Sequence, residues 1–205
     1  VVGLKQSGVQ VAALFAGLVL PSIATEFGWR AAFGVIVPLA IVFAMTAPFV
    51  APKNHTRKNR GFKLSPPSSL LLLLMAVQLC VGIALSAFVT FLPIFATQQG
   101  LPAPLAGIMI AVFGAMGIIS RLVLTPMGAR LRDESLLLFA LIAISAIAIL
   151  VTMQADPASN WKLWVGAVGV GLTAVATNAI AMGMLLRDPA FGTVTTASGL
   201  LSAAF

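Results

Sequence analysis

Two amide side chains, Gln78 and Asn178, lie inside long apolar stretches of this 205-residue sequence. An amide offers both hydrogen-bond donors and acceptors, so it can bind a polar solute in otherwise apolar surroundings. Each falls about one helical turn to the same side of the centre of its stretch, which places both at one depth in a bundle. The alternative stays open that these amides bond to neighbouring helices and only hold them together.

Arg121 is the one ionisable residue well inside an apolar stretch. Apolar stretches of this length can cross a membrane, where a charge is costly. A charged residue there is a functional candidate for that reason. Arg121 lies about two turns from one end of its stretch, from where an arginine side chain can extend to the water. We interpret it as part of a gate or an interdomain contact in preference to a solute-binding residue.

Catalytic constellations do not appear in the sequence: there is no metal-ligand cluster, nucleotide-binding glycine loop or nucleophile–base–acid set. The lone histidine, His55, lies in a basic polar segment, and the lone cysteine, Cys80, lies in an apolar stretch. No aspartate or glutamate lies deep in any stretch, so this sequence holds no proton-relay carboxylate, although one could lie in helices outside it. We expect no enzyme activity, no cofactor, no metal and no nucleic-acid partner.

The composition indicates a membrane protein. Hydrophobic residues make up 60% of the chain and charged residues 8%, and the mean hydropathy is +1.09. Soluble domains carry roughly 25% charged residues, so the apolar surplus here must face something apolar, and lipid is the obvious candidate. The net charge of +7 does not indicate nucleic acid, because the basic residues lie in short gaps between apolar stretches.

Six apolar stretches are long enough to cross a bilayer, whose core of about 30 Å needs about 20 helical residues. Backbone polar groups in lipid must be bonded internally, which selects helices. The predicted helices span residues 4–24, 31–50, 69–97, 103–127, 135–153 and 161–186, and the start of a seventh spans 193–205. The predicted fold class is an all-α, polytopic helical bundle, with a break at 25–30.

Basic residues divide unequally between the two sides of this bundle. One side holds ten of the twelve: Lys5, Lys53, Arg57, Lys58, Arg60, Lys63, Arg121, Arg130, Arg132 and Arg187. The other side holds Arg30 and Lys162. Because basic loops stay in the cytoplasm, we expect the loop at 52–68 to be cytoplasmic. We expect the membrane to be the plasma (inner) membrane. All three tryptophans fall near the opposite ends of helices, where indoles favour the interface.

Small residues recur at about four-residue spacing in three of the predicted helices. They are Gly8, Ala12, Ala16 and Gly17 in the first, Gly107, Ala111, Gly114 and Gly117 in the fourth, and Gly166, Gly169, Gly171, Ala174 and Ala181 in the sixth. Such stripes let helix backbones approach closely. They predict a compact bundle, although close packing does not by itself require transport.

Several segments resemble the major facilitator superfamily of membrane transporters. They are Gly3-Leu4-Lys5-Gln6-Ser7-Gly8, Phe27-Gly28-Trp29-Arg30-Ala31-Ala32-Phe33, the basic loop at 52–68, the stretch 114–133, and Ala197-Ser198-Gly199-Leu200. The resemblance covers the whole chain and implies a fragment of the family's 12-helix fold, from the fifth helix to part of the eleventh. It implies that 1–51 forms the last two helices of an N-terminal bundle and that 52–68 links two bundles. Residues 69–205 would then form an incomplete C-terminal bundle.

The resemblance also implies a function, the secondary transport of a small solute by alternating access. The family's seventh and tenth helices line its cavity, and they correspond here to 69–97 and 161–186. The substrate-binding residues implied by this correspondence are Gln78, Thr90, Thr177 and Asn178. The threonines have an alternative, since such hydroxyls often bond to their own backbone. The expected partners are the lipid bilayer and a small-molecule substrate, and a coupling ion is left open.

Gly128, Arg130 and Asp133 lie where the sequence is similar to the family's loop between its eighth and ninth helices. Together with Arg121, they form the candidate cytoplasmic gate. The family's fullest signature has an aspartate before the basic residue of this loop, whereas Ala129 precedes Arg130 here. Asp133 could partly substitute in the charge pairing.

Two other classes of function stay open at the level of sequence. One is a polytopic sensor or assembly protein that uses the same scaffold without transport. The other is an inactive product of a truncated transporter gene. The sequence does not identify the solute, the direction of movement or the coupling ion.

Overall fold

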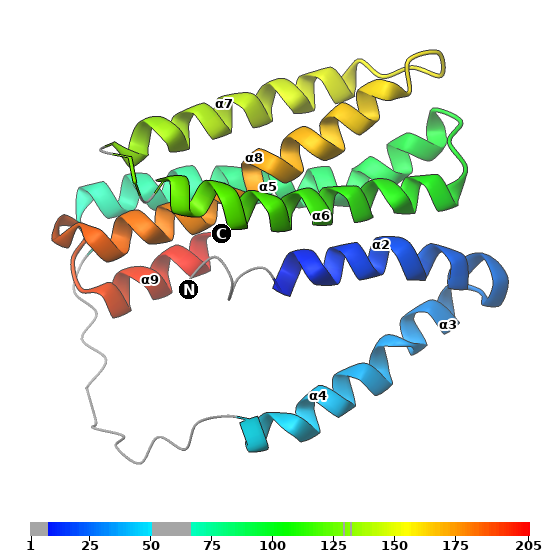
Figure 1. The fold of residues 1–205 in the computed structure, drawn as a ribbon, viewed down its shortest axis with the longest axis horizontal. Coiled ribbons are helices and arrows are strands. Elements are labelled where there is room, and N and C mark those ends of the chain that lie inside the picture. The colour runs from blue at the N-terminus through cyan, green and yellow to red at the C-terminus, as the bar shows by residue number, and fades with distance from the viewer. Residues whose placement is uncertain (1–7, 51–66, 129, 132) are drawn as a thin grey trace.

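The computed structural model describes residues 8–50, 67–128, 130–131 and 133–205. These residues form helices and short connections, with no strand among them (Figure 1). The helices are α2 (Gly8–Phe27), α3 (Trp29–Gly34), α4 (Ile36–Val50), α5 (Ser69–Gln98), α6 (Ala103–Gly128), α7 (Glu134–Met153), α8 (Trp161–Arg187), the 3₁₀ turn η1 (Pro189–Phe191) and α9 (Val194–Ala204). The predicted all-α fold class is confirmed.

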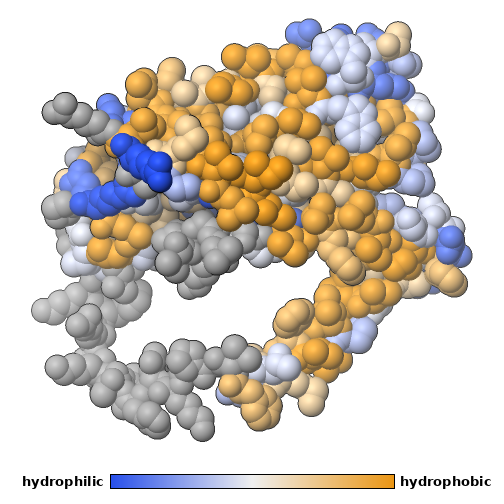
Figure 2. All heavy atoms as spheres, in the orientation of Figure 1, coloured by the Kyte–Doolittle hydropathy of each residue, from blue (hydrophilic) through white to orange (hydrophobic). Residues whose placement is uncertain are grey.

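Six helical segments of the described chain are long and apolar enough to cross a membrane, and α3 and α4 together form the second of them. Their bounds lie within a few residues of the predicted ones. Figure 2 shows hydrophobic side chains across the middle of the visible face and hydrophilic ones toward two opposite ends. This distribution suits a bundle whose middle lies in lipid.

The predicted break at residues 25–30 is wrong in its extent. Thr25 and Glu26 continue α2 to Phe27, and only Gly28, with a φ of 82°, separates α2 from α3. A positive φ favours glycine because it has no Cβ. The Thr25 hydroxyl donates to the carbonyl oxygen of Ser22 over 2.9 Å. The helix thus satisfies this polar side chain itself and need not end before it.

α6 and α8 are at the centre of the described bundle. α6 packs against α2 on one side and against α8 on the other, and α8 also contacts α5, α7 and α9. α8 is the most buried of the six spans. α4 packs mainly against α3 and lies apart from the other spans (Figure 1). We name the two ends of the bundle the Arg187 end, where α6 and α8 finish, and the Trp161 end, where α8 begins.

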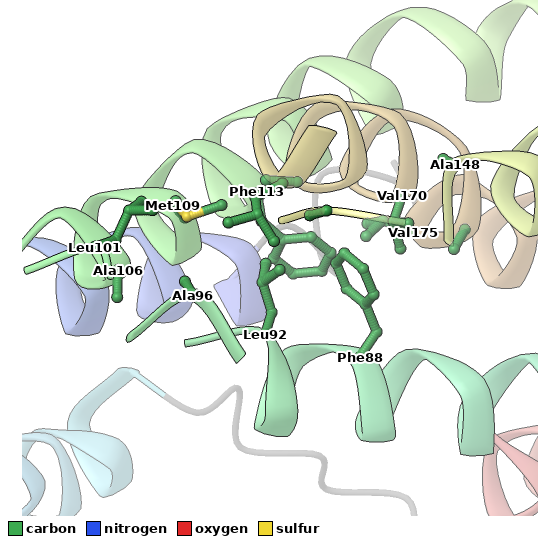
Figure 3. Close-up of a cluster of buried hydrophobic side chains, with 14 residues drawn as sticks. Phe88, Leu92, Ala96, Leu101, Ala106, Met109, Phe113, Ala148, Val170 and Val175 are labelled. Atoms are coloured by element: carbon green, nitrogen blue, oxygen red, sulfur yellow. The ribbon is translucent and has the colours of Figure 1, made fainter. Parts of the chain in front are cut away.

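One apolar cluster fixes the position of α5 along α6 and α8. Phe88 and Leu92 of α5 belong to the same buried cluster as Phe113 of α6 and Val170 and Val175 of α8 (Figure 3). A second cluster near the Arg187 end joins α5, α8 and α9. Aromatic and branched side chains of this size contribute most of the contact area in a helical core.

The small-residue stripes of α2 and α6 meet at backbone distance. A Cβ on Gly17 would lie 2.5 Å from the backbone nitrogen of Ala111, and one on Gly114 would lie 2.7 Å from that of Leu14. Real Cβ atoms do not approach so closely, so only glycine fits. The predicted close packing is confirmed for this pair of helices. Gly8, a member of the same predicted stripe, has no heavy atom within 4 Å of its Cβ position.

The stripe in α8 makes close contacts on two sides. A Cβ on Gly171 would lie 2.7 Å from the carbonyl oxygen of Phe113 in α6. A Cβ on Gly169 would lie 2.7 Å from the Cβ of Ala148 in α7. The sequence predicted this stripe without indicating which helices it faces.

We predict that Gly114→Ala destabilises the protein although alanine favours a helix. The added methyl group meets the backbone of α2, and overpacking typically costs about 1–3 kcal/mol. The matched control is Gly183→Ala in α8, where a Cβ would meet nothing within 4 Å. There, helix propensity alone should stabilise the protein by up to about 1 kcal/mol. Thermal unfolding of both variants in detergent tests this, and equal effects would contradict the close contact between α2 and α6.

Candidate functional site

Gln78 of α5 and Thr177 of α8 are brought together by the fold. Gln78 is fully buried, and its Nε2 donates to the backbone carbonyl oxygen of Thr177 over 3.4 Å. This carbonyl can accept a second hydrogen bond besides that of its helix. The other half of the amide, Oε1, is buried and has no hydrogen-bond partner. Gln78 therefore links two helices and keeps one unmet acceptor.

Thr177 uses its own hydroxyl within α8. Its Oγ1 donates to the carbonyl oxygen of Ala174 over 2.7 Å. Thr177 also lines a cavity of about 150 Å³ between α5, α7 and α8, whose lining is mostly apolar and includes Cys80 and Ser145. The cavity gives a solute few polar contacts.

Asn178 follows Thr177 and points about 100° away from it around α8. It is half-buried, and its Oδ1 is buried without a hydrogen-bond partner. Among the four predicted substrate contacts, Asn178 is the one that combines partial exposure with an unmet acceptor.

Thr90 lies on a different surface. It is twelve residues beyond Gln78 in α5, which corresponds to about 18 Å along the helix axis. Its side chain is exposed and lines a separate groove of about 470 Å³ with Ser86 and Phe205. The fold thus joins Gln78 with Thr177 and places Thr90 away from them.

Arg121 of α6 is enclosed by the protein. The residue is 4% exposed, and its Nε and Nη1 are buried without hydrogen-bond partners. One turn earlier, a Cβ on Gly117 would lie 2.5 Å from Cγ of Gln10, so α2 covers this part of α6. The Arg121 side chain could reach water from its place about two turns inside the helix, but in the structure it does not.

The three remaining gate candidates lie at the Arg187 end. Gly128 is buried at the end of α6, where a Cβ would lie 3.2 Å from Cδ2 of Leu137 in α7. Arg130 is exposed. Asp133 caps α7, since its Oδ1 accepts hydrogen bonds from the backbone nitrogen of Ser135 over 3.0 Å and from the Ser135 hydroxyl over 2.5 Å. These bonds hold the pKa of the Asp133 carboxyl below its usual value.

The ion pair between Glu134 and Arg187 is a feature that sequence reasoning missed. It joins the first turn of α7 to the last turn of α8 at the Arg187 end. A signal for it was present, because an acidic residue in a first turn and a basic residue in a last turn both suit the helix dipole. Their partnership depends on α7 packing beside α8.

Gln10 and Thr125 were also missed. Gln10 of α2 is buried, and its Oε1 has no partner. Thr125 of α6 is half-buried, and its Oγ1 is likewise buried without a partner. Gln10 could have been noticed as a polar residue in the first apolar stretch, whereas nothing in the sequence distinguishes Thr125 from the other threonines.

Part of the predicted site lies outside the described residues. Lys5, Ala129 and Arg132 belong to this part, as does most of the 52–68 loop with its five basic residues. The side of the membrane that each end faces and the domain boundaries therefore stay predictions. Within the described ranges, no three His, Cys, Asp or Glu side chains gather in a group that could hold a metal ion.

Comparison with known proteins gives one family. The family model described as Major Facilitator Superfamily matches residues 1–205. No curated protein and no solved structure matches the chain. The matched range includes the turn at the Trp161 end, where the guanidinium of Arg30 lies 4.9 Å from the ring centroid of Trp29.

We predict that Asp133→Ala lowers thermal stability near neutral pH, because the first turn of α7 loses its hydrogen-bond acceptor. The folded-state pKa of Asp133 is lowered. The carboxylate therefore stabilises the fold fully above its unfolded pKa, and this contribution is lost as the pH falls through the folded pKa. The difference between wild type and variant should close below about pH 4.

The measurement is thermal unfolding in detergent across this pH range. Ser135→Ala is the matched variant, because it removes one of the two donors and keeps the backbone bond. It should show a smaller loss with the same pH trend. A stability difference that does not change with pH would refute the role of the ionised carboxylate.

Proposed function

The chain belongs to the Major Facilitator Superfamily, a family of membrane transporters. On this premise we propose that it moves a small solute across the membrane by alternating access. Six candidate spans make it a multi-pass membrane protein. In this proposal, residues 1–51 and 69–205 belong to two bundles joined by the 52–68 loop. The bundles rock about a site near the middle of the membrane.

We place the protein in the plasma (inner) membrane with the Arg187 end in the cytoplasm. The division of basic residues between the two sides supports this orientation. Trp29 and Trp161 both lie at the other end, where they mark a membrane interface. The proposed solute therefore enters or leaves the cytoplasm between the ends of α2, α6 and α8.

Asn178 and Gln78 are the proposed substrate contacts, and the observation that carries this is their unmet hydrogen-bonding capacity. Both side-chain oxygens are buried without partners. A buried unsatisfied polar group costs about 1–3 kcal/mol, which a solute donor at this position would offset. Thr177 holds the Gln78 amide in place through its carbonyl. Thr90, about 18 Å further along α5, suits a later contact on the solute's path.

The proposed gate comprises Arg121, Gly128, Arg130 and Asp133. Its support is the packing at the Arg187 end, where α6 finishes at a buried glycine against α7 and the cap of α7 follows within five residues. Movement of α6 relative to α7 would change all four positions together.

We predict that Asn178→Ala raises the solute concentration for half-maximal uptake about three- to tenfold, because one hydrogen bond is lost. Gln78→Ala should raise it similarly and also lower thermal stability, since the hydrogen bond between α5 and α8 is lost. The measurement is uptake into vesicles of a solute that protein-free vesicles exclude. Gln154→Ala is the matched control, because it removes an exposed amide at the Trp161 end.

Unchanged half-saturation in both variants would refute the substrate assignment. Saturable solute binding without any flux would refute transport and indicate a sensor instead.

For the gate, we predict that Arg121→Lys speeds labelling of a cysteine placed by Ile180→Cys in a Cys80→Ser background. Ile180 is buried beside Gly128 at the Arg187 end. The lysine ammonium is more strongly hydrated than a guanidinium, so its burial should favour the closed arrangement less. Labelling several-fold faster than in the Arg121 protein is expected. Equal labelling together with normal uptake would exclude Arg121 from the gate.

A further inference from the structure

None of the acidic side chains in this sequence is available to neutralise Arg121. The sequence has five acidic residues, all within the described ranges. Four are engaged at helix ends and turns: Asp133 with Ser135, Glu134 with Arg187, Asp156 with Ala158, and Asp188 with Ala190. The fifth, Glu26, lies at the far end of α2, sixteen residues or about 24 Å beyond Gln10, which covers α6 near Arg121.

An arginine enclosed in this way keeps its charge, because a guanidinium is not deprotonated in proteins. A buried charge without a partner is costly, and arginine in a membrane segment is stabilised by pairing. Arg121 is 4% exposed, and no described atom accepts a hydrogen bond from its Nε or Nη1. Its charge is therefore not balanced by an acidic side chain of this sequence, and an anion from outside it would supply the counter-charge.

Thr125 supplies a second free donor on the same face of α6, one turn after Arg121. Several of the other threonines in the spans donate to carbonyl oxygens of their own helix: Thr46 to Val42, Thr97 to Ile94, Thr152 to Ala148, Thr173 to Gly169 and Thr177 to Ala174. The Thr125 hydroxyl is buried and makes no such bond. Its donor is therefore available to a ligand.

We propose that Arg121 and Thr125 form a binding site for a small anion that carries a carboxylate or phosphate group. The planar guanidinium can donate to two anion oxygens at once, and the hydroxyl can donate to a third position. Gln10, packed over Gly117, bounds the site on the α2 side. The assignment of this anion as the transported solute rests on the proposed function, whereas the binding site itself does not.

The test is thermal unfolding of the purified protein in detergent, titrated with sodium acetate, sodium succinate or sodium phosphate. Sodium chloride at matched ionic strength is the reference. We expect at least one of the three anions to raise the unfolding temperature saturably, because a ligand that binds only the folded state stabilises it. A response to the carboxylates alone or to phosphate alone identifies which of the two groups is bound.

Variants test whether the rise in unfolding temperature comes from an anion bound at Arg121 and Thr125. Thr125→Val should raise the half-saturating concentration about tenfold or more, since it removes a hydrogen bond to a charged group. Arg121→Lys should weaken the response, and Arg121→Gln should abolish it. Thr46→Val and Arg30→Gln are matched controls that should leave it unchanged, because Thr46 bonds its own helix and Arg30 is exposed beside Trp29.

The proposal is overturned if none of the three anions shifts the wild-type unfolding temperature beyond chloride. It is also overturned if Thr125→Val responds like the wild type, a result that stays decisive should Arg121→Gln fail to fold. A saturable shift without uptake would keep the site and refute transport. Uptake of an uncharged solute with no anion shift would keep transport and refute the site.

Discussion

Backbone contact on two faces of α6 is the interaction on which the described bundle depends. Lipid provides little hydrophobic drive between helices, so close packing must hold them together. α6 meets α2 through Gly17 and Gly114, and it meets α8 through Gly171. Arg121 lies on this same helix, between the same neighbours. The contact of three helices therefore encloses Arg121 and leaves its charge without a partner among the described residues.

The spans could be predicted from the sequence because length and apolarity are enough to define a membrane helix. Their ends were less certain, since a polar side chain such as Thr25 can be satisfied inside a helix. The glycine stripes predicted close approach without naming the partners. Which helices meet depends on contacts such as that between Gly171 and Phe113, which lie far apart in the chain. The domain boundaries and the 52–68 loop stay predictions.

Individual residues of the candidate site could be predicted from the sequence, but the contacts between them could not. Gln78 was identified by its amide in an apolar stretch, yet its bond to Thr177 crosses 99 positions of sequence. Thr125 and Thr177 are the same residue type in similar surroundings, and only one of them bonds its own helix. That choice is made by side-chain conformation and by neighbouring helices, neither of which the local sequence records. A single threonine therefore gives no sign of being a free donor.

The same unmet polar groups connect binding to conformational change. Under the proposed anion site, closing α2 and α8 around an unpaired Arg121 costs several kcal/mol of desolvation. A bound anion offsets that cost, so it favours the enclosed arrangement over any arrangement in which Arg121 is solvated. A ligand shifts a conformational equilibrium only by its difference in affinity for the two states. Here the difference in affinity arises because the anion neutralises the Arg121 charge in the enclosed state, where an unpaired charge is costly. Under the proposed function, in which this anion is the transported solute, closure of the Arg187 end would depend on the solute itself.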